Sequence, residues 1–251
     1  MLRRIGNKAV AIAHRARGLY WTDYLRRRRP VAYAPYDVSV YRDLLRQLRG
    51  RDDVRLAPFN QSALEPDRVN FFLRHDVDTA QCVANLAMVA ERNAAESVSA
   101  AVYLRCDGDE YRPVDAATAV ARCRALGFEV GLHSSAYVQD DSAAALRREL
   151  DVFADAFGFA PRSVTIHGLG EFRLAERQAL VAHLIGSLAT YGLDFTDAHE
   201  SLRAYDHVIT DCHPDPASGK RFIYGDMLRL PPLLRRGRAY LVLTHPCYWK
   251  A

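Results

Sequence analysis

The stretch "FFLRHDVDTA" at residues 71–80 decides how this 251-residue chain is interpreted. Asn70 to Arg74 is a short, mainly apolar run typical of a buried strand, and a helical pattern begins directly after Asp78. Ionisable groups are seldom buried without a partner, so a histidine and two aspartates at the end of such a strand need a role. Asp76 and Asp78 lie two positions apart, which turns both side chains to the same side of an extended backbone. The stretch therefore indicates a site in which two carboxylates act together.

Beyond this stretch, apolar runs alternate with helical patterns such as "TAQCVANLAMVAERNAA" and "SAAALRRELDVFADAFG". Repetition of strand and helix is typical of α/β folds with a parallel sheet and right-handed crossovers. About seven units favour an irregular (β/α)7 barrel over an open doubly wound sheet. The predicted strands are Asn70–Arg74, Val98–Leu104, Glu129–Leu132, Ser163–Ile166, Asp194–Phe195 with its flanks, His207–Thr210 and Ala239–Leu243.

The chain is predicted to be one barrel domain, residues 31–251, behind a basic N-terminal arm, residues 1–30. Residues 31–68 form a lead-in that contains a helix ended by Gly50, and the barrel begins at about residue 69. The arm carries nine Lys or Arg against Asp23, a charge of +8, so that the total of +4 leaves −4 for the rest. The body of the protein therefore gives no reason to expect a nucleic-acid partner.

Apolar residues recur in the arm at helical spacing, with arginines between them. We expect a helix that packs on the domain, with peripheral contact to an anionic membrane surface as the alternative. The longest apolar run of the arm, Ala9 to Ala13, is short for a secretion signal. Five cysteines without CxxC spacing favour a reducing compartment, and the expected location is the cytoplasm, with the inner face of the membrane as the alternative.

Asp or His follows five of the predicted strands. In a parallel barrel the carboxyl ends of the strands form one face, on which these side chains would converge. Any one of them could be a satisfied core residue or a cap, and Asp78 in particular could cap the following helix. The coincidence of five strand ends is what indicates a site. The residues are His75, Asp76 and Asp78, then His133, His167, Asp211 and His245.

A mixed cluster of Asp and His suits a divalent metal, with zinc expected first and cobalt, nickel or manganese as alternatives. Such an ion lowers the pKa of bound water towards ~7, which makes hydroxide available for hydrolysis at neutral pH. Of the two neighbouring carboxylates, one can hold the metal while the other takes a proton from the water. The sequence therefore predicts a metal-dependent hydrolase.

Four motifs, "RHDVD", "FEVGLHS", "TIHG" and "LVLTHP" in this order, resemble the polysaccharide deacetylases of carbohydrate esterase family 4, particularly their divergent branch with an "HDVD" first motif. The resemblance covers roughly residues 70–245 and implies an irregular barrel that uses a metal to remove an N-acetyl group from a sugar. It also implies roles for single residues: Asp76 as general base, Asp78 and His133 as metal ligands, His245 as general acid, and Leu243 beside the acetyl pocket.

The chain departs from this family in its second motif, which usually reads His-Ser-x-x-His. Tyr137 stands where the second histidine is expected, and a phenol is a poor zinc ligand. His167, at the end of the next predicted strand, is the proposed substitute. His75 is a second candidate, although strand alternation turns it away from Asp76 and into the wall.

Further residues are expected around the site. Asp211 is a candidate to orient His245. Tyr137, Glu171, Arg173 and the aromatic pair Tyr248 and Trp249 are candidates to line a substrate groove, with a buried core position as the alternative for Trp249.

The expected substrate is an N-acetylated sugar, in particular a lipid-linked or nucleotide-linked glycan precursor. Two alternatives stay open: a glycan-binding protein whose metal site on the same barrel has degraded, and a hydrolase of a small non-sugar amide, since a fold does not fix specificity.

Overall fold

The structure, a computed structural model, describes residues 36–59, 64–136, 142–167, 183–184, 186–197, 207–210 and 234–250. The basic arm lies outside these ranges, as do four residues predicted for the site: Tyr137, Glu171, Arg173 and Asp211. Within the described ranges, no helix combines the length and the apolar character that a membrane span needs.

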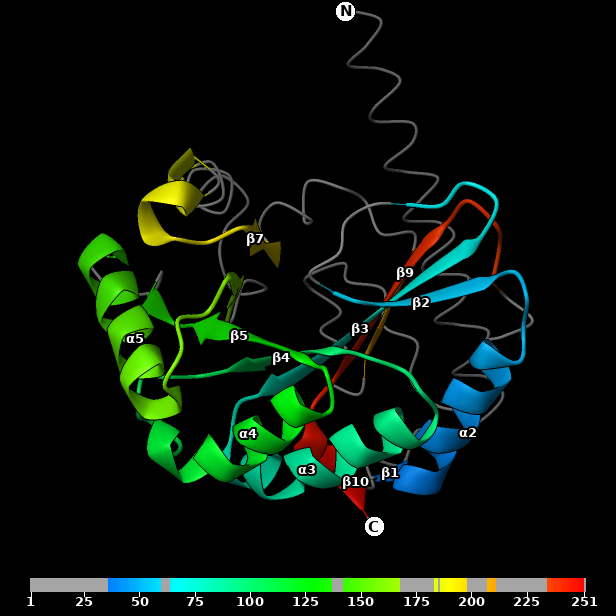
Figure 1. The fold of residues 1–251 in the computed structure, drawn as a ribbon, viewed down its shortest axis with the longest axis horizontal. Helices are drawn as coiled ribbons and strands as arrows, with labels where there is room; N and C mark the ends of the chain where they lie inside the picture. Colours follow the sequence, from blue (N-terminus) through cyan, green and yellow to red (C-terminus); the bar gives the residue numbers. More distant parts are fainter. Residues whose placement is uncertain are drawn as a thin grey trace, which may run out of the picture.

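Parallel strands form one curled sheet at the centre of the molecule (Figure 1). The strands are β2 Val54–Pro58, β3 Val69–Val77, β4 Ala101–Leu104, β5 Glu129–Ser134, β6 Ser163–Ile166, β7 Phe195–Thr196, β8 His207–Thr210 and β9 Ala239–Thr244. Seven of them follow one another in the order β7, β6, β5, β4, β3, β9, β8, and β2 pairs with β3 outside this row. A short parallel pair, β1 (Tyr36–Asp37) with β10 (Trp249–Lys250), joins the first described residues to the last.

The central strand β3 is longer than the sequence predicts. Along one edge it pairs with β9 through Asn70–His75. Strands β2 and β4 lie one after the other along the opposite edge. Strand β2 pairs with Val69–Leu73, and β4 pairs with Arg74–Val77. The pairing with β4 extends β3 beyond the predicted end at Arg74. His75 and Asp76 therefore belong to the strand itself.

Four helices cover the outer, convex face of the sheet (Figure 1). They are α2 Val38–Arg49, α3 Ala80–Ala95, α4 Ala117–Ala125 and α5 Ser142–Phe157. Helix α2 ends at the predicted Gly50, and at its start Asp37 accepts a hydrogen bond from the Ser39 N–H at 2.7 Å. Two 3₁₀ turns, η1 Pro113–Ala116 and η3 Leu188–Tyr191, precede α4 and β7 in the chain.

The two faces of the sheet bury different residues. On β3, Phe71, Leu73 and Val77 belong to the large core between sheet and helices. The alternate residue Phe72 belongs to a second, smaller cluster on the concave face, with Tyr103 of β4 among its members. Strand alternation thus places Arg74 and Asp76 on the concave face.

The predicted α/β class is confirmed, with seven parallel strands in one curled row and helices outside. The predicted strands all occur, although β4 begins at Ala101 and not at Val98, and β5 extends to Ser134. In the part of the chain that the structure describes, β7 and β8 are the two ends of the row.

Candidate metal centre and active site

Polar side chains from four strands meet at the carboxyl edge of the concave face. Asp76 lies on β3 and Asp78 directly after it, while His133 is the fifth residue of β5. His167 and His245 follow the last residues of β6 and β9. Residues that are far apart in the sequence are thereby brought to one place, as the strand ends predicted.

Asp78 does not cap helix α3. The cap is Thr79, whose side chain accepts a hydrogen bond from the Cys82 N–H at 3.2 Å. The two carboxylate oxygens of Asp78 instead face two different histidines: Oδ1 lies 3.4 Å from His133 Nε2, and Oδ2 lies 3.4 Å from His245 Nε2. Oδ1 is buried without a hydrogen-bond partner among the described residues, which leaves it available to a ligand.

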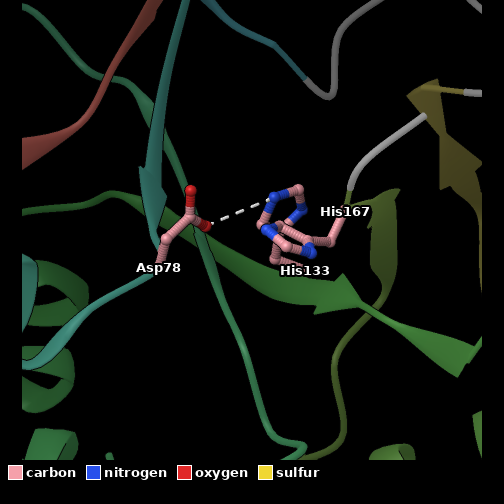
Figure 2. A group of neighbouring side chains, drawn as sticks. All are labelled: Asp78, His133 and His167. Carbon is pink, nitrogen blue, oxygen red and sulfur yellow. Dashed lines mark ion pairs between the residues drawn. The ribbon is translucent and has the colours of Figure 1, made fainter. Parts of the chain in front are cut away.

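Asp78, His133 and His167 form a group that could hold a metal ion (Figure 2). One ligand atom of each lies within 4.8 Å of the others. The rings of His133 and His167 meet edge to face, with centroids 5.2 Å apart. Zinc bonds of ~2.0 Å to nitrogen and oxygen imply tetrahedral edges of roughly 3.3 Å, close to the Asp78–His133 separation, so a bound ion would draw the remaining ligand atoms closer.

His133 is held in a form that suits a metal ligand. Its Nδ1 lies 2.7 Å from Thr165 Oγ1 on β6. With the proton on Nδ1 donated to Thr165, the lone pair of Nε2 faces Asp78. Burial lowers the pKa of His133 to about 4, although the charges of Asp76 and Asp78 oppose this effect. The imidazole is therefore neutral at neutral pH.

Asp78 carries a negative charge in this environment. Burial favours the neutral acid, but the hydrogen bond from His245 outweighs it, together with the positive charges that His133 and His245 carry at the acidic pH where the carboxyl group titrates. The pKa of Asp78 is therefore below its usual value. An ionised carboxylate beside a neutral imidazole is the ligand chemistry that a divalent cation of borderline softness prefers.

Arg74 fixes the second carboxylate, Asp76. Its Nε lies 2.6 Å from Asp76 Oδ1 and its Nη2 lies 2.8 Å from Asp76 Oδ2, a two-bond ion pair. The remaining Nη1 donates to Asp197 Oδ2 at 2.9 Å, and Asp197 Oδ1 accepts the Ile166 N–H at 3.1 Å. Burial opposes the charge of Arg74, but the two carboxylates outweigh it and raise the pKa of the guanidinium.

The charges of this cluster also fit a cation. Arg74 contributes one positive charge against the three carboxylates of Asp76, Asp78 and Asp197, so negative charge is in excess among these four side chains when the carboxylates are ionised. Uncompensated buried charge is costly, and a divalent cation would balance it. The unpartnered Oδ1 of Asp78 and the neutral His133 are therefore consistent with a metal at this place.

Arg74 and Asp197 were missed in the sequence, although each left a signal. Arg74 is an arginine inside an apolar strand, two positions before Asp76 and hence on the same face. Asp197 directly follows β7, in the same position relative to its strand as Asp78 and His167 relative to theirs. Thr165, two residues before His167, could not be recognised as a site residue from the sequence, because threonine is common in strands.

Two of the remaining candidates lie away from the concave face. His75 points to the helices, as predicted: its Nδ1 lies 2.5 Å from Thr244 Oγ1, and burial lowers its pKa to about 4. For Trp249 the substrate groove and a buried core position were both considered, and the placement in the groove is wrong. The Trp249 side chain is 0% exposed and packs against Tyr41 of α2 with ring centroids 5.0 Å apart.

Leu243 and Tyr248 remain near the site. Leu243 is partly buried against the concave cluster, and its place beside an acetyl pocket is a prediction. Tyr248 is 42% exposed, with its ring centroid 5.9 Å from that of His245. Of the two aromatic residues near the end of the chain, Tyr248 is therefore the one whose ring a sugar could reach.

Comparison with known proteins gives similarity at the level of fold. No protein-family model and no curated protein matches the chain. The catalytic domain of peptidoglycan N-acetylglucosamine deacetylase from Eubacterium rectale is similar over 75% of this chain and 81% of that chain, at 13% identity and a TM-score of 0.48. A carbohydrate esterase family 4 pseudoenzyme from Bacillus anthracis is similar over 78% and 62%, at 14% identity and a TM-score of 0.41.

A third structure, a mutant of peptidoglycan deacetylase PdaC from Bacillus subtilis, is similar over 72% of this chain and 90% of that chain, at 12% identity and a TM-score of 0.39. The structural neighbours thus come from the polysaccharide deacetylase group, which the sequence motifs also resemble. Likenesses this distant concern the fold alone, and the argument for activity rests on the site.

Proposed function

We propose that the protein is a metal-dependent hydrolase that removes the N-acetyl group from an N-acetylated sugar. The observation that carries this proposal is the meeting of ligand atoms from Asp78, His133 and His167 within 4.8 Å of one another. A second carboxylate, Asp76, and a further histidine, His245, lie next to this group. The motif resemblance supplies the reaction class, and the ligand geometry supplies a reason to expect that the missing second histidine of the family is replaced.

In this proposal Asp78, His133 and His167 hold a divalent cation, with zinc as the first candidate. When bound, such a cation polarises a carbonyl group and lowers the pKa of nearby water. Asp76, held in place by Arg74, accepts the proton of the attacking water. His245, on the other side of Asp78, donates a proton to the departing nitrogen. Water and the amide thereby become acetate and a free amine.

The finer description of the substrate is also a proposal. We propose a lipid-linked or nucleotide-linked glycan precursor in the cytoplasm. The charge of +8 on residues 1–30 would help with a lipid-linked one, because it favours contact with an anionic membrane surface. Nucleic acid is not expected as a partner, and hydrolysis of a small non-sugar amide is kept as a variant of the same chemistry.

Release of acetate is the test. We expect the zinc-loaded protein to release acetate from N-acetylglucosamine oligomers or from nucleotide-linked N-acetylhexosamines, and Asp76→Asn and His245→Ala each to lower kcat by at least about 100-fold. The substitution of Tyr137 for the second histidine favours a second candidate, a glycan-binding protein without activity. Binding of the same glycans without acetate release by the metal-loaded wild type would establish that candidate and overturn the hydrolase proposal.

A further inference from the structure

Two cysteines lie beneath the contact between Asp78 and His245. Cys82 is in the first turn of α3, four residues after Asp78, and Cys247 is in the 3₁₀ turn η6 (Pro246–Tyr248), two residues after His245. The two thiols are in hydrogen-bonding contact. The contact between Cys82 and Cys247 thus lies between α3, which follows Asp78, and η6, which follows His245.

Asn85 holds these segments in register. Its Nδ2 donates to the Pro246 carbonyl and to the Trp249 carbonyl, both at 3.0 Å. Residues three apart on a helix lie on the same face, so Asn85 binds η6 from the face of α3 that also presents Cys82. The two bonded carbonyls flank Cys247 in the sequence and keep its thiol against Cys82.

The two thiols differ in access. Cys82 is 0% exposed, whereas Cys247 is half-buried. A small disulfide in solution can therefore reach Cys247 first, and Cys82 is placed behind it to attack the sulfur of Cys247. Cys123 of α4 is also 0% exposed and serves as a buried cysteine outside this pair.

We propose that Cys82 and Cys247 are a reversible redox pair, which a small disulfide such as glutathione disulfide converts into an intramolecular disulfide bond. The Cys247 thiolate attacks one sulfur of glutathione disulfide and forms a mixed disulfide, releasing one glutathione thiolate. The Cys82 thiolate then attacks the Cys247 sulfur, and the second glutathione leaves as a thiolate. The protein loses two protons and two electrons, and glutathione disulfide gains the electrons.

The bond would fasten η6 to α3 and thereby fix His245 relative to Asp78. A glutathione-poised compartment keeps such a pair reduced until the ratio of disulfide to thiol rises, so the pair would respond to oxidative conditions. Formation of the disulfide does not depend on the proposed hydrolase function. Its effect on acetate release does rest on that function.

The test is oxidation of the full-length protein with glutathione disulfide, trapping of remaining thiols with N-ethylmaleimide, and mass spectrometry of the intact protein and its peptides. We expect the wild type to lose two hydrogens and two alkylation sites, with a peptide that links Cys82 to Cys247, reversed by dithiothreitol. Cys82→Ser should stop at one glutathione adduct on Cys247, Cys247→Ser should give neither adduct nor link at this pair, and Cys123→Ser should behave as the wild type.

Full alkylation of both cysteines in oxidised wild type would overturn the proposal, as would a stable glutathione adduct on wild-type Cys247. The rate at which diethyl pyrocarbonate labels His245 can be compared between the oxidised and the reduced protein. This rate shows, without any substrate, whether the disulfide restricts His245. We expect slower labelling after oxidation, and equal rates would remove the link to the site. A protein that forms the disulfide on oxidation, but releases no acetate in its reduced and zinc-loaded form, would contradict the proposed function and leave the redox pair intact.

Discussion

Arg74 and Asp76 face each other on the concave side of β3 and form two hydrogen bonds, at 2.6 and 2.8 Å. The rings of Phe59 and Tyr103 lie over the guanidinium, with centroids 5.2 and 5.3 Å from its central carbon. The third point of attachment is Asp197 of the segment after β7. A side chain bound on so many sides has little freedom, so Arg74 determines where the proposed base lies.

Replacement of Arg74 by Met should destabilise the fold by about 3–5 kcal/mol, because it leaves two buried carboxylates without their cation. Arg74→Lys should cost less, since it keeps the charge but cannot form the two-bond pair. Urea denaturation of the purified variants measures both. As a control, Arg112→Met breaks the exposed pair with Asp115 and should leave the unfolding free energy unchanged. Equal losses at Arg74 and Arg112 would contradict the structural role given to Arg74.

His167→Ala should weaken zinc binding as much as His133→Ala. Each removes a direct ligand, so we expect more than the ~10–100-fold loss that follows removal of an outer hydrogen-bond partner. Thr165→Val, which removes the partner of His133 Nδ1, should fall within that smaller range. His183→Ala, at an exposed position, is the matched control. Titration with zinc under competition from a chromophoric chelator measures the affinities, and wild-type affinity in His167→Ala would remove His167 from the site.

Replacement of the two aromatic residues near the end of the chain, Tyr248 and Trp249, should have clearly different effects on stability. Trp249→Ala should cost about 3–5 kcal/mol of stability, because it empties a fully buried position against Tyr41. Tyr248→Ala, at a 42% exposed side chain, should change stability by less than about 0.5 kcal/mol. Thermal and urea denaturation provide the comparison. If Trp249→Ala left stability unchanged and weakened glycan binding, the core position given to Trp249 would be wrong.

The alternation of strands and helices was sufficient to predict the fold class and the edge at which the site forms. Both depend on local patterns, namely apolar runs of strand length and the polar residues that follow them. The end of β3 was placed too early because the sequence of one strand does not show its partner: pairing with β4 keeps His75 and Asp76 extended. The length of a strand depends on the strands that pair with it, so it cannot be predicted from the composition of that strand alone.

The meeting of Asp78, His133 and His167 was predicted from the sequence, whereas the residues that hold Asp76 in place were missed. Asp78, His133 and His167 are conspicuous because each stands at a strand end. Arg74 was overlooked because it stands within a strand, where its importance depends on Asp197, more than 120 residues away. Trp249 was misplaced for a similar reason, since only the position of α2 decides whether its ring is covered.

Gly131 of β5 leaves room for the side chains of Ser163 and Tyr103 to pack against the β5 backbone. A Cβ at this position would lie 2.5 Å from Ser163 Oγ and 2.6 Å from a ring carbon of Tyr103, closer than real contacts permit. Gly131→Ala should therefore cost about 1–3 kcal/mol and disturb the ring that covers Arg74. Gly186→Ala, where nothing lies within 4 Å of the added carbon, should be neutral or slightly stabilising. Urea denaturation compares the two, and equal effects would show that the sheet adjusts around Gly131.

Glu149 of α5 should make stability depend on pH. Its carboxylate is buried beside Ser134 and Ser135, without a hydrogen bond of good geometry among the described residues. Burial raises its pKa from 4.5 to about 7; the nearby charge of Asp107 adds to the rise, whereas Arg105 and the hydrogen bond from Ser134 oppose it. Between these pH values the folded protein binds a proton that the unfolded chain has released, so the stability contributed by this group falls as the pH rises from about 4.5 to about 7.

Glutamine at position 149 cannot release a proton, so Glu149→Gln should be close to the wild type in stability at pH 4.5 and more stable above pH 7. The shift from 4.5 to about 7 corresponds to a gain of roughly 3 kcal/mol at the upper end. Urea denaturation of both proteins at several pH values measures the difference, which should grow through this window and then level off. A difference that stays constant from pH 4.5 to pH 8 would mean that Glu149 titrates normally and that its carboxylate reaches solvent in the folded protein.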